Sequence, residues 1–410
     1  MLSWPDRYMP PAPKEIIHPE LNLLDSFQRR KIPLSGDEIS IYVCGITPYD
    51  ATHMGHAATY LTFDLVHRYL KASGKRVILV QNVTDIDDPL LERASKDRQD
   101  WSDLAQSQIE LFREDMTSLS VLPPTAYRGV IEAIDEIIDL VSDFIKSGKG
   151  YQIDGDIYLD LAQVDGAISN LPLSPDQALQ IFQERGGDPS RVGKRHPLDP
   201  LLWKARRGDD PFWPAPFGEG RPGWHIECTS IALKNLPRAT VTSISLQAGG
   251  SDLMFPHHYM TGIQAKALTG IEFASCYAHT GMIGLNGEKM SKSKGNLVFI
   301  SKLRHEGVSP AVIRIALLKQ KYSIDRMWSE ELIHEAEEFL AKILSALSRQ
   351  EVAPALQVIQ AMVKALADDL DTPKVFELLS SWCERTEGGE VGGSAGEISR
   401  ALDTYLGIVL

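Results

Sequence analysis

Residues 39–80 read ISIYVCGITPYDATHMGHAATYLTFDLVHRYLKASGKRVILV, and they predict a strand, a turn, a long helix and a second strand. Residues 39–44 alternate and are rich in β-branched side chains, which is typical of a strand, and Pro48 lies in the turn that follows. A helix is expected through residues 61–69, and the apolar run at 77–80 predicts the second strand. This spacing suits a βαβ crossover in a parallel sheet, so the stretch predicts the first part of a Rossmann-like domain.

The character of the sequence changes after residue 120. A helix carries five branched apolar residues between 131 and 145, and a hairpin is expected to turn at Asp154-Gly155. The sheet is expected to resume near Gly223, with a strand at 241–247, and Ser309-Pro310 predicts the start of a helical tail. We therefore expect an α/β fold, a Rossmann-like catalytic domain with an inserted α+β module and a C-terminal helical bundle. The expected ranges are 1–120 and 201–300 for the two halves of the catalytic domain, 121–200 for the inserted module and 301–410 for the helical domain.

The bulk composition narrows the class of protein. The 410 residues contain no run of about 18 apolar side chains that could span a bilayer. The N-terminus lacks the charged and apolar regions of a secretory signal, so we expect a cytoplasmic protein. A net charge of −13 disfavours extensive nucleic-acid binding. Four scattered cysteines indicate thiol chemistry or metal ligation rather than a disulfide framework.

His53-Met54-Gly55-His56 lies where the loop after the first strand enters the helix. The glycine would let a nucleotide approach the backbone, and two imidazoles near a helix N-terminus could contact its phosphates. Taken alone, however, histidines at the start of a helix more often cap the helix or lie on the surface.

A second motif, Lys289-Met290-Ser291-Lys292-Ser293, follows much later, among glycine and asparagine residues typical of a loop. Ammonium groups there could contact the β- and γ-phosphates of ATP as pyrophosphate departs. A solvated basic loop would explain this pentapeptide alone. It does not explain the ordered pair of motifs on a Rossmann-like frame.

Two cysteines and a histidine offer the donor atoms of a metal site. Cys44 ends the first predicted strand, while Cys228 and His257 lie far along the chain. Thiolates and an imidazole suit a tetrahedral Zn²⁺, and three protein ligands would leave the fourth position open for a substrate thiolate. Buried structural cysteines and a core histidine are the alternative, because cysteine often behaves as a small hydrophobe.

The two phosphate motifs together resemble the HIGH and KMSKS signatures of class I aminoacyl-tRNA synthetases, which form aminoacyl adenylates from an amino acid and ATP. Within that class, the sequence is similar to cysteinyl-tRNA synthetase and to its relatives, the cysteine ligases of mycothiol biosynthesis. The resemblance extends over essentially the whole chain. It is carried by residues 42–50 (YVCGITPYD), 82–88 (NVTDIDD), 222–228 (PGWHIEC), 249–258 (GGSDLMFPHH) and 371–374 (DTPK).

This resemblance implies a complete site. It makes Cys44, Cys228 and His257 the ligands of one Zn²⁺ per chain, and it makes ATP, with Mg²⁺, a substrate. The catalytic groups that it implies are His53, His56, Lys289 and Lys292. The residues that it places around the adenylate are Cys44, Gly45, Ile46, Thr47, Gly55, Thr59, Asn82, Val83, Thr84, Trp224, Gly250, Ser251, Asp252 and Ile283. Cys276 and Cys383 match no ligand position and are expected to be structural.

Three departures from cysteinyl-tRNA synthetase bear on the acceptor. Tyr259-Met260-Thr261 stands where that family has Glu-Asn-Glu, whose last acid completes its metal site, and Pro89 stands where it has lysine. Residues 331–410 carry 14 acidic and 6 basic side chains, a net charge of −8, which is a poor surface for transfer RNA. All three departures point toward the mycothiol ligases, and the segment Glu184–Pro189 (ERGGDP) is similar to one of theirs. Two local departures from the ligases remain: Tyr259, and Ala248, where both families usually have glycine.

The resemblance to the ligases implies ATP-dependent joining of L-cysteine to the amine of glucosaminyl-inositol through a cysteinyl adenylate, with release of AMP and pyrophosphate. The expected partners are these small molecules, with no nucleic acid and no membrane, and the expected state is a monomer. A cysteinyl-tRNA synthetase is one alternative. A non-catalytic zinc- and nucleotide-binding protein with a synthetase-like fold is the other.

Overall fold

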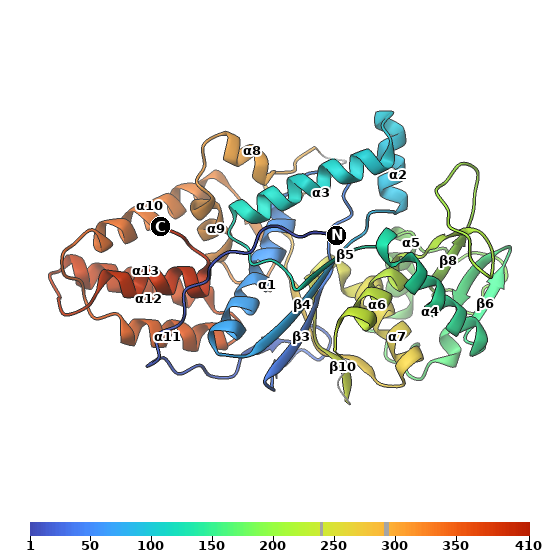
Figure 1. Cartoon of the computed structure of the whole chain (residues 1–410), viewed down its shortest axis with the longest axis horizontal. Coiled ribbons are helices and arrows are strands. Elements are labelled where there is room, and N and C mark those ends of the chain that lie inside the picture. Colours follow the sequence, from blue (N-terminus) through green and yellow to red (C-terminus); the bar gives the residue numbers. More distant parts are fainter. Residues whose placement is uncertain (238–240, 291–294) are drawn as a thin grey trace.

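The computed structural model describes residues 1–237, 241–290 and 295–410, arranged as three parts in a row (Figure 1). A parallel sheet with α1 lies in the middle, an antiparallel sheet with α4 and α5 lies at one end, and the C-terminal helices lie at the other. None of the helices described is long and apolar enough to cross a membrane.

The central sheet has the strand order of a Rossmann-like domain. Its order is β11-β10-β3-β4-β5, and every neighbouring pair is parallel. The direction of the strand order therefore reverses between β3 and β10, which is where such sheets bind ligands, beyond the carboxyl ends of the strands. The strands are β3 (Glu38–Val43), β4 (Arg76–Val83), β5 (Ala126–Gly129), β10 (Thr242–Gly250) and β11 (Glu272–Thr280).

Both faces of this sheet are covered, because successive side chains of a strand point to opposite faces. Ile41 and Val43 of β3 belong to one hydrophobic core, together with α1 (Met54–Ala72). Tyr42 and Cys44 belong to the other, together with α6 (Trp224–Asn235) and α7 (Tyr259–Thr269). The predicted strand, helix and second strand are thus confirmed. α1 ends at Ala72, with Ser73 as its C-cap and Gly74 in the left-handed region after it.

The antiparallel sheet has the order β6-β7-β8-β9 and differs in its limits from the expected module of residues 121–200. The four residues of β5 pair with β4 of the central sheet, while β8 and β9, after residue 200, complete the antiparallel sheet. These pairings join residues far apart in the chain, so local sequence pattern does not reveal them. The elements are η1 (Ile131–Ala133), α4 (Ile134–Lys146), β6 (Gly150–Ile153), β7 (Asp156–Leu159), η2 (Leu161–Gln163), α5 (Pro175–Glu184), β8 (Leu201–Ala205) and β9 (Gly220–Pro222).

The C-terminal part is mostly helical but is not purely so, because β14 (Arg326–Trp328) pairs with β12 (Ile283–Leu285). β12 also pairs with the two-residue strand β13 (Glu288–Lys289). The helices here are α8 (Ile300–His305), α9 (Pro310–Leu318), α10 (Glu330–Leu347), α11 (Leu356–Ala367), α12 (Thr372–Glu387), α13 (Ala395–Ala401) and η6 (Leu402–Leu406). The remaining elements are β1 (Asn22–Leu24), β2 (Lys31–Pro33), α2 (Asp88–Asp97), α3 (Trp101–Ser118), η3 (Ser251–Leu253) and η4 (Met254–His258).

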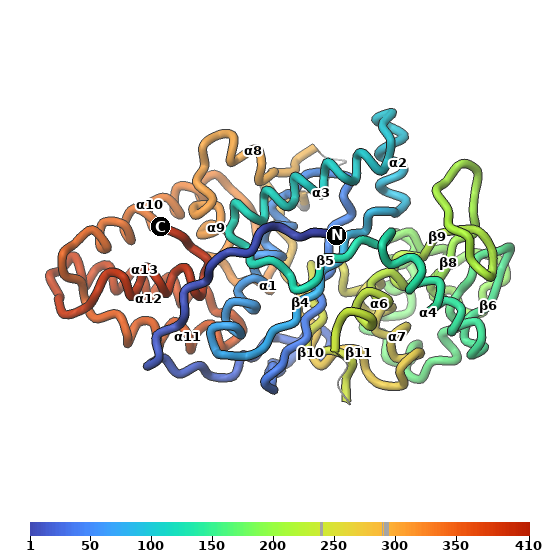
Figure 2. The backbone as a smooth tube through the Cα atoms, in the orientation of Figure 1, coloured from blue at the N-terminus to red at the C-terminus, as the bar shows by residue number. Residues whose placement is uncertain are grey.

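The N-terminal segment joins the central part to the C-terminal helices. It runs from the middle of the molecule past these helices before it returns to the sheet (Figure 2). Thr404 donates to the carbonyl of Pro10 at 2.9 Å, and the side chain of Gln360 both donates to and accepts from the backbone of Ile17. The two parts therefore share a continuous core.

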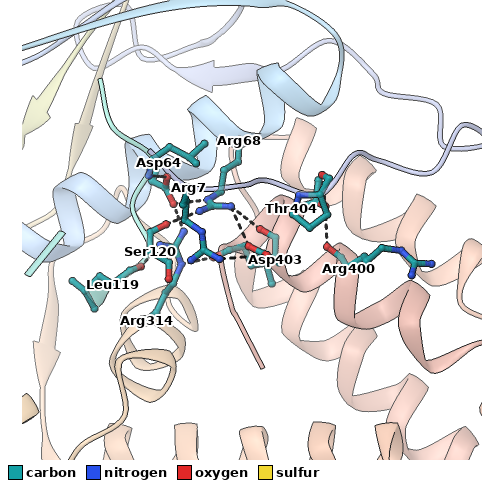
Figure 3. A network of polar contacts seen from close by, with 12 residues as sticks. Arg7, Asp64, Arg68, Leu119, Ser120, Arg314, Arg400, Asp403 and Thr404 are labelled. Atoms are coloured by element: carbon teal, nitrogen blue, oxygen red, sulfur yellow. Dashed lines mark hydrogen bonds and ion pairs between the residues drawn. The ribbon is translucent and has the colours of Figure 1, made fainter. Parts of the chain in front are cut away.

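A buried arginine fastens α1 to the end of the chain (Figure 3). Arg68 donates to the Asp64 carboxylate at 2.8 Å, to the carbonyl of Ser120 at 2.5 Å and to the carbonyl of Asp403 at 2.6 Å. Arg68 and Asp64 are fully buried, so water cannot replace these bonds.

A second buried arginine, Arg314 of α9, shares the same carboxylate. It also donates to the carbonyls of Leu119, at 2.7 Å, and Leu406. A Cβ at Gly407 would lie 2.5 Å from the guanidinium carbon of Arg314, so only glycine fits at this position. Burial alone would raise the pKa of Asp64, but the two guanidiniums outweigh it and lower that pKa, so the carboxylate is ionised.

We expect Asp64→Asn to lower the stability of the protein by about 3–5 kcal/mol, because two buried guanidiniums would lose their shared anion. The measurement is the urea midpoint of unfolding. Glu384→Gln is the control, since Glu384 pairs with Lys342 on the surface and its loss should leave the midpoint nearly unchanged. Equal shifts for the two variants would contradict a special role for the buried network.

Candidate active site and metal centre

The loop that follows β3 lies between the ends of β4 and β10. The backbone N–H of Cys44 donates to the carbonyl of Ala248 at 3.0 Å, and that of Gly45 donates to Oδ1 of Asn82 at 2.8 Å. The N–H of Thr84 donates to the carbonyl of Ile46 at 2.9 Å. Residues 44–47 and 82–84, expected from the sequence to lie around an adenylate, therefore meet at the carboxyl edge of the sheet.

Gly45 is required by a close approach of two chain segments. A Cβ there would lie 1.6 Å from the carbonyl oxygen of Asn82, so no larger residue fits. The amide of Asn82 also donates to Oγ1 of Thr84 at 3.2 Å. The loop after β3 is therefore fixed against β4 by steric contact and by hydrogen bonds.

The N-terminus of α1 faces the same edge. His53 is the N-cap, and its Nδ1 accepts from the N–H of Gly55 at 3.1 Å. The rings of His53 and His56 stack with centroids 3.8 Å apart, and Thr59 shares a 2.8 Å hydrogen bond with Thr280 at the end of β11. The first turn of α1 contains no acidic residue, so the positive end of the helix dipole is available to an anion.

The end of β10 lies beside the N-terminal part of α1. Gly250 precedes a short helical turn of Ser251 and Asp252, and a Cβ at Gly250 would lie 2.5 Å from the carboxylate of Asp252. It would also lie 3.8 Å from Oγ1 of Thr59, so β10 and α1 approach each other here. Ile283 is buried on β12, just beyond β11.

The lysines of the second phosphate motif are only partly described. The backbone of Lys289 lies in β13, paired with Gly284. Lys292 lies outside the residues that the structure describes.

Cys44, just after β3, comes together with Cys228 of α6 and His257 of η4. The two Sγ atoms are 3.8 Å apart, and Nε2 of His257 is 3.2 Å from Sγ of Cys228. All three donor atoms lie within 4.8 Å of one another, and all three residues are buried. Two sulfurs that each lie about 2.3 Å from one tetrahedral ion are themselves about 3.8 Å apart, so the separation of the two cysteines fits a bound metal.

The electrostatics of the cysteine pair also suit a cation. Burial alone would raise the pKa of the Cys228 thiol, but a hydrogen bond from Cys44 and the neighbouring His257 imidazole outweigh burial and lower it. Burial, followed by the hydrogen bond with Cys228 and the charge of Cys228, raises the pKa of Cys44. A divalent cation between the two sulfurs would stabilise both cysteines as thiolates.

Sequence reasoning missed the histidines around this triad. Nδ1 of His225 is 3.0 Å from Nδ1 of His257, and Nε2 of His258 is 3.1 Å from Sγ of Cys44. Nδ1 of His258 is in turn 2.7 Å from Nε2 of His279. Burial lowers the pKa of both histidines, that of His279 to about 3. The adjacent pair His257-His258 was the available signal, but sequence alone does not say which imidazole faces which sulfur.

The indole of Trp224 packs on one residue of the triad. It stacks on the ring of His257, with centroids 4.3 Å apart and an angle of 23° between the planes. Trp224 is the first residue of α6, one turn before Cys228, so one helix supplies both a candidate ligand and the ring that stacks on His257.

Known proteins share the fold of this chain. Residues 31–338 match the family described as tRNA synthetases class I (C) catalytic domain. Methionyl-tRNA synthetase of Mycobacterium tuberculosis, solved with methionyl-adenylate, has a similar fold, with a TM-score of 0.62 at 15% identity over 91% of this chain and 89% of that one. The fold and the family match thus define a class I synthetase catalytic domain.

Curated relatives are similar from end to end. The L-cysteine:1D-myo-inositol 2-amino-2-deoxy-alpha-D-glucopyranoside ligase of Rhodococcus erythropolis is 48% identical over 420 residues, covering 100% of both chains. The protein of the same name from Streptomyces griseus is 48% identical over 417 residues, again covering 100% of both. The chain belongs to this ligase family, within the class I synthetase fold.

Gly45→Ala should lower the melting temperature, because overpacking of this kind costs about 1–3 kcal/mol or more when backbone must move. Thermal unfolding followed by circular dichroism measures it. Gly396→Ala in α13 is the matched control, since its nearest neighbour is the end of the Arg400 side chain, which can move aside. A wild-type melting temperature for Gly45→Ala would mean that the contact with Asn82 is not tight.

Proposed function

We propose that this protein joins L-cysteine to the amine of glucosaminyl-inositol, the substrate for which its relatives are named, in an ATP-dependent reaction through a cysteinyl adenylate. One observation carries the proposal. Cys44, Cys228 and His257 meet at the carboxyl edge of a class I sheet, between the strands where ligands of such sheets bind. A site of this composition gives the fold a means of recognising a thiol.

We infer that the triad holds one Zn²⁺ per chain. Two thiolates and an imidazole are preferred donors of zinc, and with three protein ligands a fourth position remains for substrate. Zinc bound here would supply a position that takes the substrate thiolate in preference to a hydroxyl, and so would favour cysteine over serine. Trp224 would restrict the space around that position.

The first step needs positioning and charge stabilisation. The cysteine carboxylate attacks the α-phosphorus of ATP, the bond to the β-phosphate breaks, and pyrophosphate leaves. His53, His56 and the N-terminus of α1 would contact the phosphates, and Lys289 and Lys292 would stabilise the charge that develops on pyrophosphate. Asp252 at the end of β10 would bind a ribose hydroxyl or the cysteine ammonium.

In the second step the neutral amine of the amino sugar attacks the cysteinyl carbonyl, an amide bond forms and AMP leaves. The helical part argues for a small acceptor, because residues 331–410 carry a net charge of −8. Such a surface lacks the lysines and arginines that would neutralise the phosphates of a transfer RNA.

We expect about one zinc per chain in the purified protein and a strong reduction in Cys228→Ser, because two remaining protein ligands are too few for a stable site. Inductively coupled plasma mass spectrometry gives the stoichiometry. Cys383→Ser is the control, since Cys383 is buried in α12 and outside the triad. Unchanged zinc in Cys228→Ser would remove that residue from the site.

The acceptor is tested by incubating the protein with cysteine and ATP, together with either glucosaminyl-inositol or transfer RNA. We expect AMP release to rise with the amino sugar and not with transfer RNA, and mass spectrometry to find a product enlarged by one cysteinyl group. Accumulation of charged transfer RNA beside unmodified amino sugar would contradict the proposal and favour the synthetase alternative.

A further inference from the structure

The segment Arg185–Asp188 of the antiparallel part lies close to the loop that carries His257. It follows α5, and α5 packs against η4, the short helical turn that contains His257. The two segments are about seventy residues apart in the chain, so their contact is a product of the fold.

The contact is a hydrogen bond to the backbone of the metal-site loop. Phe255 has extended dihedral angles, φ −137° and ψ 136°, within an otherwise helical turn. A residue of this kind interrupts the helical hydrogen-bond pattern, so its buried polar groups need partners from elsewhere. Nη1 of Arg185 donates to the carbonyl of Phe255 at 3.1 Å, two residues before His257.

The backbone around Arg185 is itself held in place. Arg185 is the C-cap of α5, and Gly186 has φ +84°, in the left-handed region that favours glycine. Gly187 lies flat against the ring of Phe182, where a Cβ would come within 2.3 Å of a ring carbon. Both glycines therefore have a steric reason to be glycine.

Asp188 anchors the end of the segment to the antiparallel sheet. Its carboxylate accepts from the hydroxyl of Tyr158 on β7 at 2.5 Å and from Nζ of Lys194 at 3.0 Å. The side chain of Lys194 is only 2% exposed, whereas that of Asp188 is 41% exposed, so the carboxylate is held by a buried lysine at the edge of the sheet. Arg185 thus extends from a fixed base toward the Phe255 carbonyl.

A second bond joins the same two parts of the molecule. The hydroxyl of Tyr259, two residues after His257, donates to the carbonyl of Ala167 at 2.9 Å, and the residue is buried. The antiparallel part therefore contacts the His257 loop on both sides of the histidine.

We propose that Arg185 is a positioning residue that holds His257 in the geometry of a metal ligand, and that the Arg185–Asp188 segment serves this purpose. The consequence for metal binding rests on the proposed zinc site, whereas the restraint on the loop does not. Without the bond to Phe255, the loop gains conformations in which His257 faces away from Cys228. Metal binding must then restrict the loop to one conformation, and this loss of entropy weakens the binding. Partners that hydrogen-bond metal ligands directly typically change metal affinity by about 10- to 100-fold, which sets the scale for a restraint on the backbone beside a ligand.

The test compares Arg185→Met, which keeps an apolar side chain of similar length, with Arg185→Lys, which restores one donor. Arg207→Met is the matched control. Arg207 lies in the same part of the molecule and pairs with Asp156 at 2.6 Å, away from the His257 loop. Hydrogen exchange of the peptide covering residues 250–262 is measured in metal-free protein, and zinc release to a chromogenic chelator is measured in loaded protein.

We expect Arg185→Met to exchange faster in that peptide and to release zinc about 10-fold faster or more. Arg185→Lys should fall between it and the wild type, and Arg207→Met should match the wild type. Equal behaviour of Arg185→Met and Arg207→Met in hydrogen exchange would overturn the proposal. If the wild type holds no zinc, the proposed metal fails, but the exchange data still decide whether Arg185 restrains the loop.

Discussion

The meeting of Cys44 with Cys228 and His257 is the contact on which the site depends. Cys44 can reach the other two because β3 lies next to β10 in the sheet. The side chains along β3 point alternately to the two faces of the sheet, and that of Cys44 points to the face covered by α6. The Sγ atoms then lie 3.8 Å apart in a buried region, where unpaired charge is costly and a cation would be strongly held. The loop after β3 packs so closely on β4 that a Cβ at Gly45 would clash with the carbonyl of Asn82.

In the proposed reaction, the two faces of the sheet have different tasks. Thiol recognition would belong to the face of α6 and η4, and phosphate binding would belong to the face of α1, whose N-terminus carries His53 and His56. The buried network of Arg68, Asp64 and Arg314 fixes α1 to the end of the chain (Figure 3). On the other face, the hydrogen bond from Arg185 to the carbonyl of Phe255 joins the antiparallel part to the His257 loop.

Local pattern predicted the β3–α1–β4 unit well, because alternation in residues 39–44 and Ser73-Gly74 at the helix end are short-range signals. It did not predict the membership of β5 or β14, whose few residues gain their structure from distant partners. Ser309 begins α9 as expected, yet its side chain makes no capping hydrogen bond. The triad was anticipated by resemblance, whereas the contacts of His258 and Arg185 depend on side-chain directions that only the folded chain supplies.

X-ray absorption at the zinc edge tests the central claim most directly, because it counts the sulfur atoms bound to the metal. The account predicts two sulfur donors in the protein with zinc alone, three when cysteine is added, and still two when serine replaces cysteine. A spectrum that keeps two sulfur donors at saturating cysteine would contradict the claim that the Cys44, Cys228 and His257 site selects its substrate through the thiol.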